Sequence, residues 1–170
     1  MNGKIIAISA ISSALSIILL TLGHYVSILD LSCLMFASIV IMLPLYKKSI
    51  KGAIFSFFST LILTCFLTGF KLNIIIPYAL FFGLHPIFNE IQINKNFNKW
   101  ICFIIKLIWF ILSLFVMYFT TNMFVDINEK AEKYFYIAIP IVGILFFILY
   151  DILFLRLRKR LDILLKNIGL

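Results

Sequence analysis

Six apolar stretches fill this chain of 170 residues, and the lysines and arginines between them crowd into every second connection. A helix that crosses a bilayer needs about 20 mostly apolar residues. The stretches lie at about 5–23, 31–46, 52–70, 72–90, 100–121 and 134–155. They predict one membrane domain over 1–170 with six transmembrane helices, followed within it by a basic tail at 156–170.

The composition agrees with this class. The chain is 64% apolar and 13% charged, whereas soluble domains are nearer half apolar and a quarter charged. A net charge of +8 can indicate nucleic acid, but in so apolar a chain it is better explained by basic cytoplasmic loops. We therefore expect an all-α integral membrane protein with lipid, and no nucleic acid, around it.

The basic residues also predict an orientation. Connections on the N-terminal side hold eleven of them: Lys4, Lys47, Lys48, Lys51, Lys95, Lys99, Arg156, Arg158, Lys159, Arg160 and Lys166. The opposite connections hold three: Lys71, Lys130 and Lys133. Positive loops stay inside, so we expect both termini in the cytoplasm of a cell whose membrane this chain crosses several times.

Three other features have structural interpretations. Cys33, Cys65 and Cys102 show no paired spacing, so we expect small buried apolar residues rather than a disulfide or metal ligands. No cofactor is predicted. The tail keeps leucines at helical spacing from Leu157 to Leu165, and such a helix either lies along anionic headgroups or docks a partner.

The first apolar stretch carries two sets of small residues. Ala7, Ala10 and Ala14 share one helix face, and four serines lie roughly a third of a turn round: Ser9, Ser12, Ser13 and Ser16. Small residues at four-residue spacing let helix backbones approach closely in lipid. Either both faces pack inside this chain, or one packs inside and the other meets another subunit.

Two further motifs lie in residues 43–90. A basic turn with glycine, "LPLYKKSIKG", precedes the third stretch, and "FFGLHP" ends the fourth. With the early alanine pair, the length and the six spans, they make the chain resemble the substrate-binding S components of energy-coupling factor (ECF) transporters, in particular an uncharacterised Gram-positive bacterial subgroup.

The resemblance implies a mechanism and partners. An S component captures a vitamin or similar micronutrient outside the cell and passes it inward together with a transmembrane scaffold subunit and two ATPase subunits. The family docks through an alanine face on helix one, which matches Ala10 and Ala14, with Ala7 beside them. Hydrolysis of ATP would belong to the partners, and this chain has no phosphate-binding G-x-x-x-x-G-K loop.

Polar residues at the outer ends of the helices are the candidates for substrate binding. They are His24, Tyr25, Asp30, Lys71, Asn73, Tyr78, Asn122 and Asp126. Converging helix ends can close a pocket with a few polar groups over an apolar floor. Lys71 can pair with a carboxylate or phosphate, and Asp30 or Asp126 with an amine. The alternative is that these are ordinary interfacial residues.

Two charges lie within predicted spans. Lys106 is seven residues past Lys99, or roughly 10 Å inward, and Asp151 lies at a similar depth before Arg156. A lone charge in a span costs at least ~2.5 kcal/mol. We expect a Lys106–Asp151 ion pair or a snorkelling Lys106, and a proton path is the functional alternative.

Late in the fourth stretch, Pro86 predicts a kink, and we expect His85 to hydrogen-bond locally rather than to act in catalysis. We predict no enzyme, because no H-E-x-x-H, paired glutamates or Ser/His arrangement appears. The competing function is a small structural membrane protein of the rod-shape-determining kind, although the glycine-rich helices and early proline-aspartate element of that class are missing.

Overall fold

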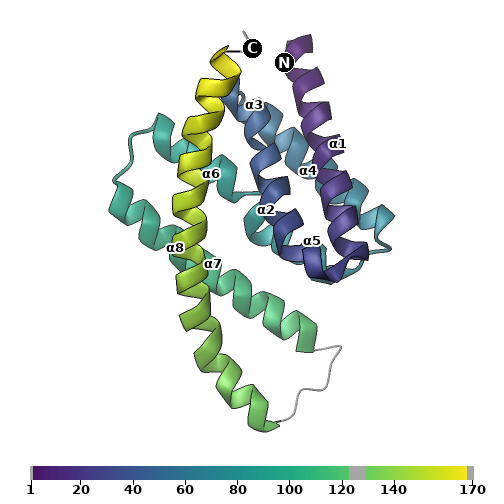
Figure 1. Cartoon of the computed structure of the whole chain (residues 1–170), viewed down its shortest axis with the longest axis vertical. Coiled ribbons are helices and arrows are strands. Elements are labelled where there is room, and N and C mark those ends of the chain that lie inside the picture. The colour runs from purple at the N-terminus through teal and green to yellow at the C-terminus, as the bar shows by residue number, and fades with distance from the viewer. Residues whose placement is uncertain (1, 123–128, 168–170) are drawn as a thin grey trace. The chain divides into compact units, whose positions relative to one another are not determined.

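The computed structural model describes the backbone of residues 2–122 and 129–167 (Figure 1), and the side chains except those of 27, 121–137, 162 and 164–167. Within these residues every regular element is a helix. The chain divides into two compact units, Met1–Lys106 and Leu107–Leu170. The predicted all-helical class is confirmed for the described part of the chain.

The elements follow one another with short connections. They are α1 (Gly3–Tyr25), the 3₁₀ turn η1 (Ser27–Leu29), α2 (Asp30–Val40), α3 (Met42–Tyr46), α4 (Ile50–Leu67), α5 (Leu72–Pro77), the π-helical turn η2 (Tyr78–Phe82), α6 (His85–Asn94), α7 (Lys99–Asn122) and α8 (Glu129–Asn167). Unit 1 holds α1 to α6 with the start of α7, and unit 2 holds the rest of α7 with α8.

Five helical segments of the described chain are long and apolar enough to cross a membrane. They are Gly3–Tyr25, Ile50–Leu67, Leu72–Asn94, Lys99–Thr120 and Ala138–Leu161. The predicted span at 31–46 corresponds to Asp30–Tyr46, which is shorter and is divided at Ile41 into α2 and α3. The structure therefore supports a multi-pass membrane protein with five such segments and a sixth, shorter apolar one.

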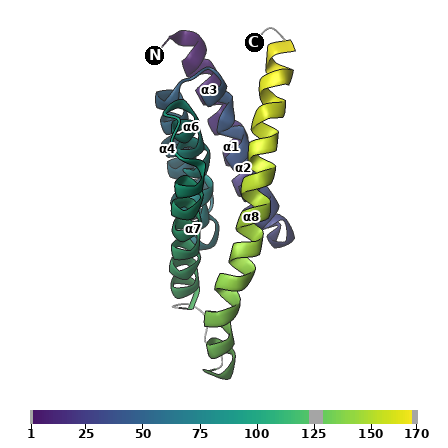
Figure 2. The same ribbon diagram turned by 90° about the vertical axis from the view of Figure 1, so that its left-hand side faces the viewer.

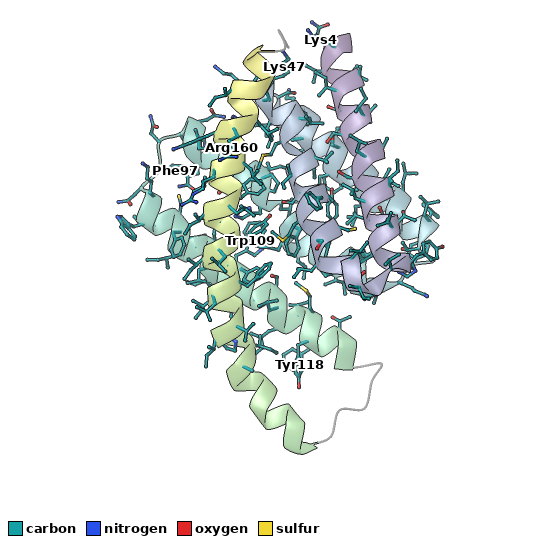
Figure 3. All side chains as sticks on the ribbon, viewed as in Figure 1. Lys4, Lys47, Phe97, Trp109, Tyr118 and Arg160 are labelled. Carbon is teal, nitrogen blue, oxygen red and sulfur yellow. The ribbon has the colours of Figure 1, made fainter. Side chains whose placement is uncertain are left out.

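Unit 1 has two ends. Lys4 and Lys47 lie at one of them (Figure 3), and we call it the basic end. From there α1 leads away, α2 and α3 return, α4 leads away again, and α5, η2 and α6 return (Figures 1 and 2). The opposite end, which we call the distal end, holds the turns at residues 26–29 and 68–71.

Local signals set the limits of α4. The Ser49 hydroxyl caps its start by accepting a hydrogen bond from the backbone N–H of Gly52, at 3.1 Å, as serine does at helix N-termini. Past its other end, Gly69 has a φ of 63°, a conformation that glycine adopts without strain. The turn that leads into α5 therefore begins where the sequence places its most permissive residue.

Glycines let the helices of unit 1 approach closely. A Cβ atom added to Gly52 of α4 would lie 2.7 Å from the Ser9 hydroxyl of α1. One added to Gly23 of α1 would lie 2.9 Å from the Cβ atom of Cys33 in α2. Because lipid provides no hydrophobic drive between helices, such close contact is the main source of their attraction.

The two small-residue faces of α1 have opposite environments. The serines are buried: Ser9, Ser12 and Ser16 are 0% exposed and Ser13 is 6% exposed. Ala7, Ala10 and Ala14 are all exposed. Of the arrangements that the sequence left open, the structure has the serine face packed inside and the alanine face turned outward.

The fourth apolar stretch contains two prolines, Pro77 in α5 and Pro86 in α6, and it is interrupted between them. After α5 the backbone widens into a π turn, in which the N–H of Gly83 donates to the carbonyl of Tyr78 at 2.8 Å. Pro86 falls in the first turn of α6, where its missing N–H needs no helical partner. The predicted irregularity is present, but it lies at Tyr78–Leu84 rather than at Pro86.

Unit 2 is an antiparallel pair of helices (Figures 1 and 2). Phe110 of α7 contacts Phe147 of α8, with ring centres 5.6 Å apart. A Cβ atom on Gly143 would lie 2.6 Å from a methyl group of Leu114, so the helices pack closely there. The helix α8 continues through Asn167 without a break at 156, as the helical spacing of the tail predicts.

Candidate functional site

The serines toward the basic end of unit 1 join helices through backbone carbonyls. Ser12 of α1 donates to the carbonyl of Val40 at 2.9 Å. Ser56 of α4 donates to the carbonyl of Ser9 at 2.9 Å, and Ser13 donates to the same carbonyl from within α1. The Ser9 hydroxyl itself has no hydrogen-bond partner among the described residues. This half of the interior is therefore largely satisfied by bonds between the helices.

A second polar group near the basic end centres on an amide. Lys106 is 2% exposed, and its Nζ donates to Oδ1 of Asn89 at 2.9 Å. The Nδ2 of Asn89 lies 3.4 Å from both ring nitrogens of His85. His85 thus has the local partner that the sequence predicted, one turn along the same helix. The sequence did not identify Asn89 as a partner of Lys106, because its only signal was its position four residues after His85 on the same helix.

The predicted partner of Lys106 lies in unit 2. Asp151 is buried there, at 4% exposure, whereas Lys106 ends unit 1. Burial of both charges agrees with the expectation that each has a polar partner. The Lys106–Asp151 pair itself stays a prediction.

Toward the distal end, buried hydroxyls lack partners. Tyr78 and Thr60 are 0% exposed and Thr64 is 1% exposed. The oxygens of all three side chains have no hydrogen-bond partner in the described part of the chain. Thr60 is close enough to influence the Tyr78 hydroxyl, but the pair does not meet the distance and angle of a hydrogen bond. The structure therefore gathers unsatisfied hydroxyls from α4 and the π turn.

The next threonine on the same face shows the usual alternative. Thr68 donates from its hydroxyl to the carbonyl of Thr64, four residues earlier, at 2.8 Å. A threonine in a helix commonly satisfies its proton in this way. Thr60 and Thr64 do not, so their hydroxyls stay available to another partner.

Three of the predicted substrate-binding residues meet at the distal end. The rings of His24 and Tyr25 are 4.9 Å apart, and His24 is near enough to Asp30 to act on it electrostatically. His24 Nδ1 and Asp30 Oδ1 are buried atoms without a hydrogen-bond partner among the described residues. Tyr25 is 72% exposed. This end of α1 therefore carries the polar groups that the sequence placed there.

The other predicted substrate-binding residues differ in placement. Lys71 and Asn73 are exposed at the start of α5, so they line its surface. Tyr78 lies one turn deeper and is fully buried. Asn122 ends α7, but its side chain and all of Asp126 lie outside the described residues.

The described residues offer no obvious metal centre. No three His, Cys, Asp or Glu side chains gather within the described ranges. Cys33 and Cys102 are buried, Cys65 is partly buried, and all three are free thiols. The candidate groups at the distal end are thus hydroxyls, the His24 imidazole and the Asp30 carboxyl group, all of which can bind ligands by hydrogen bonds.

Comparisons of this chain with protein-family models, with curated proteins and with solved structures each find no match.

Proposed function

We propose that this chain is the substrate-binding S component of an ECF-type importer. The observation that carries the proposal is the outward-facing alanine face of α1, formed by Ala7, Ala10 and Ala14. The serine face of the same helix already supplies its packing within unit 1. A strip of small side chains in lipid allows close approach by another helix, and the resemblance assigns that approach to a transmembrane scaffold subunit.

The proposal includes a topology. The chain crosses the cell membrane six times, with Asp30–Tyr46 as the shortest span, and keeps both termini in the cytoplasm. Its support is the lysine-rich basic end of unit 1 together with the rule that positive loops stay inside. The distal end, with His24 and Asp30, then faces outward.

The division of labour follows from this topology. The polar groups of the distal end capture a small molecule such as a vitamin outside the cell. The alanine face docks on the scaffold, and two ATPase subunits supply the free energy that moves the cargo inward. This chain contributes the binding site and the docking surface.

Co-purification tests the proposal directly. The tagged chain is expressed with a host's scaffold and ATPase subunits and isolated in a mild detergent. We expect the native chain to bring down all three partners. Ala10→Trp should reduce their recovery by at least about tenfold, which corresponds to about 1.4 kcal/mol of binding free energy, because the large ring prevents close approach.

Leu15→Trp is the matched control. Leu15 is also exposed on α1, at 43%, but lies about 100° round the helix from Ala14, away from the alanine face. It should bind the partners as the native chain does. If neither the native chain nor the control ever recovers an ATPase-bearing scaffold, the proposal is wrong, and a structural membrane protein becomes the better explanation.

A further inference from the structure

The unsatisfied hydroxyls of the distal half require a partner. A buried polar group without a hydrogen bond costs about 1–3 kcal/mol, and folded proteins rarely leave several together. Tyr78, Thr60 and Thr64 leave three hydroxyls unpartnered. Even a bond between Tyr78 and Thr60 would leave one of the two protons without an acceptor.

These hydroxyls continue a polar series that starts at the distal end. His24 and Asp30 lie at that end, and Thr21 is one turn along α1; each has a buried atom without a described partner. Thr60 is seven residues from the end of α4, or about 10 Å inward, and Tyr78 lies at a similar distance along its own helix. Unpartnered polar atoms therefore occur both at the distal end and at the depth of the π turn.

The innermost hydroxyl is held in place. The rings of Tyr78 and Phe57 stack with centres 5.7 Å apart and planes at 25°. A Cβ atom on Gly83 would lie 2.5 Å from the Phe57 ring and 3.0 Å from the Tyr78 ring. With glycine at this position both rings fit closely, so the Tyr78 hydroxyl keeps a fixed direction. π turns are frequent where helices carry function.

The charges near these groups limit what they can bind. Hydroxyls both donate and accept hydrogen bonds but carry no charge at neutral pH. Burying a charge costs much free energy unless the charge is paired and hydrogen-bonded. Of the series, Asp30 and His24 are the acidic and the basic member, and both lie at the distal end, beside the turn at residues 26–29.

From this arrangement we infer that the distal half of unit 1 binds an uncharged small molecule, which hydrogen-bonds through hydroxyl, amide or ring-nitrogen groups to Tyr78, Thr60 and Thr64. That this molecule is a transported cargo rests on the proposed function. The binding itself does not depend on a scaffold or on ATP.

Cysteine labelling tests the inference with three probes of similar size. They are the hydroxyethyl, trimethylammonium-ethyl and sulfonatoethyl methanethiosulfonates, which are neutral, cationic and anionic. In each case the cysteine thiolate forms a disulfide and methanesulfinate leaves. Thr60→Cys and Thr64→Cys are placed singly in a chain whose Cys33, Cys65 and Cys102 are alanine. Lipid nanodiscs keep both membrane faces open to the probes.

We expect both engineered thiols to react with the neutral probe at least about tenfold faster than with either charged probe, since about 1.4 kcal/mol of charge burial gives that ratio. Adding Tyr78→Phe to Thr64→Cys should slow the neutral probe about fivefold, the loss expected for one hydrogen bond of about 1 kcal/mol. Thermal unfolding of each variant verifies that it is folded. If one of the two cysteine variants does not fold, the ratio of labelling rates at the other still tests the inference.

Two controls lie on the same helix. Ile62→Cys replaces an exposed residue, at 53% exposure, and reports labelling through lipid. Ser56→Cys replaces a buried hydroxyl that is already bonded to Ser9. Both should react slowly with all three probes.

Three results would overturn the inference. They are no labelling at 60 and 64, equal labelling by neutral and charged probes, or labelling at Ile62→Cys as fast as at Thr60→Cys. Because the measurement needs no partner subunits, a positive result with failed co-purification would keep the binding site and reject the importer. The reverse outcome would keep the importer and reject this site.

Discussion

Most buried hydroxyls differ in bonding between the two halves of unit 1, with Ser9 and Thr68 as the exceptions. Toward the basic end, Ser12 and Ser56 donate to carbonyls of neighbouring helices. Toward the distal end, Thr60, Thr64 and Tyr78 are equally buried but have no such partners among the described residues. Ser56 and Thr60 are one turn apart on the same face of α4, so the change occurs within a few ångströms of helix.

The contrast indicates two roles for buried hydroxyls: some stabilise the packing of the helices, and others can bind a ligand or water. A hydroxyl that bonds to a carbonyl on another helix stabilises the bundle by a modest amount. A buried hydroxyl with no partner lowers stability until a ligand or water satisfies it. The distal half thus gives up some stability, as regions that bind ligands commonly do.

The largest effect is expected at Gly83, beside the Phe57 and Tyr78 rings. Gly83→Ala should lower the free energy of unfolding by about 3 kcal/mol, because the new methyl group would lie against Phe57 and Tyr78 and force them apart. Gly3→Ala, which meets nothing within 4 Å, should have little effect. Thermal unfolding in detergent measures both variants. Equal melting temperatures for Gly83→Ala and Gly3→Ala would show that Phe57 and Tyr78 are not tightly packed around Gly83.

The lysine of the basic half should give the next largest change. Lys106→Met removes the charged donor to Asn89 and should cost about 2 kcal/mol, the range for hydrogen bonds to charged groups. Lys71→Met, at an exposed site, should stay within about 0.5 kcal/mol. Urea unfolding of both variants tests this. If the Lys106→Met chain were as stable as the native one, the bond from Lys106 to Asn89 would not stabilise the basic half of unit 1.

The same variant also tests the predicted ion pair. If Lys106 pairs with Asp151, then Lys106→Met and Asp151→Asn should be non-additive, and the double variant should be more stable than the sum of the two losses implies. Additive losses, or equal expression and stability for all three variants, would reject the pair while leaving the Asn89 bond unaffected.

A smaller loss is expected where a serine joins α1 to α4. Ser56→Ala removes the donor to the Ser9 carbonyl and should cost about 1 kcal/mol, as measured for hydrogen bonds between membrane helices. Differential scanning calorimetry of the purified chain can resolve such a change. A variant more stable than the native chain would show that this hydroxyl does not hold the helices together.

The smallest change should have the opposite sign. Thr60→Val and Tyr78→Phe each remove an unpartnered hydroxyl and keep the shape, so stability without ligand should stay equal or rise by up to about 1 kcal/mol. Chemical unfolding of ligand-free protein checks this. A loss as large as that of Ser56→Ala would mean that these hydroxyls are already bonded, and the contrast between the halves would disappear.

Much of the fold is predictable because its signals are local. Spans follow from runs of apolar residues, and five of the six predicted ones appear as helices that are long and apolar enough to cross a membrane. The different faces of the alanines and serines on α1 follow from helical spacing alone. Which face packs inside did not, because that depends on Gly52 and Val40, which come from other helices.

The candidate site was harder to predict for the same reason. His24 and Asp30 were named because helix ends are visible in the sequence. Thr60 was not named, since a threonine in an apolar run has no local mark of being unpartnered. Pro86 pointed to an irregularity in the fourth apolar stretch. The π turn lies earlier, at Tyr78–Phe82, where Gly83 lies close to the Phe57 ring, and a contact between such distant parts of the chain has no local signal.

The π turn at Tyr78–Phe82 also has a consequence for the register of the helix that contains it. A π turn holds about one residue more than an α turn, so everything after it is rotated by about 100° relative to a continuous α-helix. Deleting one residue there, such as Leu80, should turn His85 and Asn89 away from their present direction by about that angle. The extra residue therefore sets the rotation between the two parts of this apolar segment, and with it the directions in which Tyr78 presents its hydroxyl and Asn89 presents its amide.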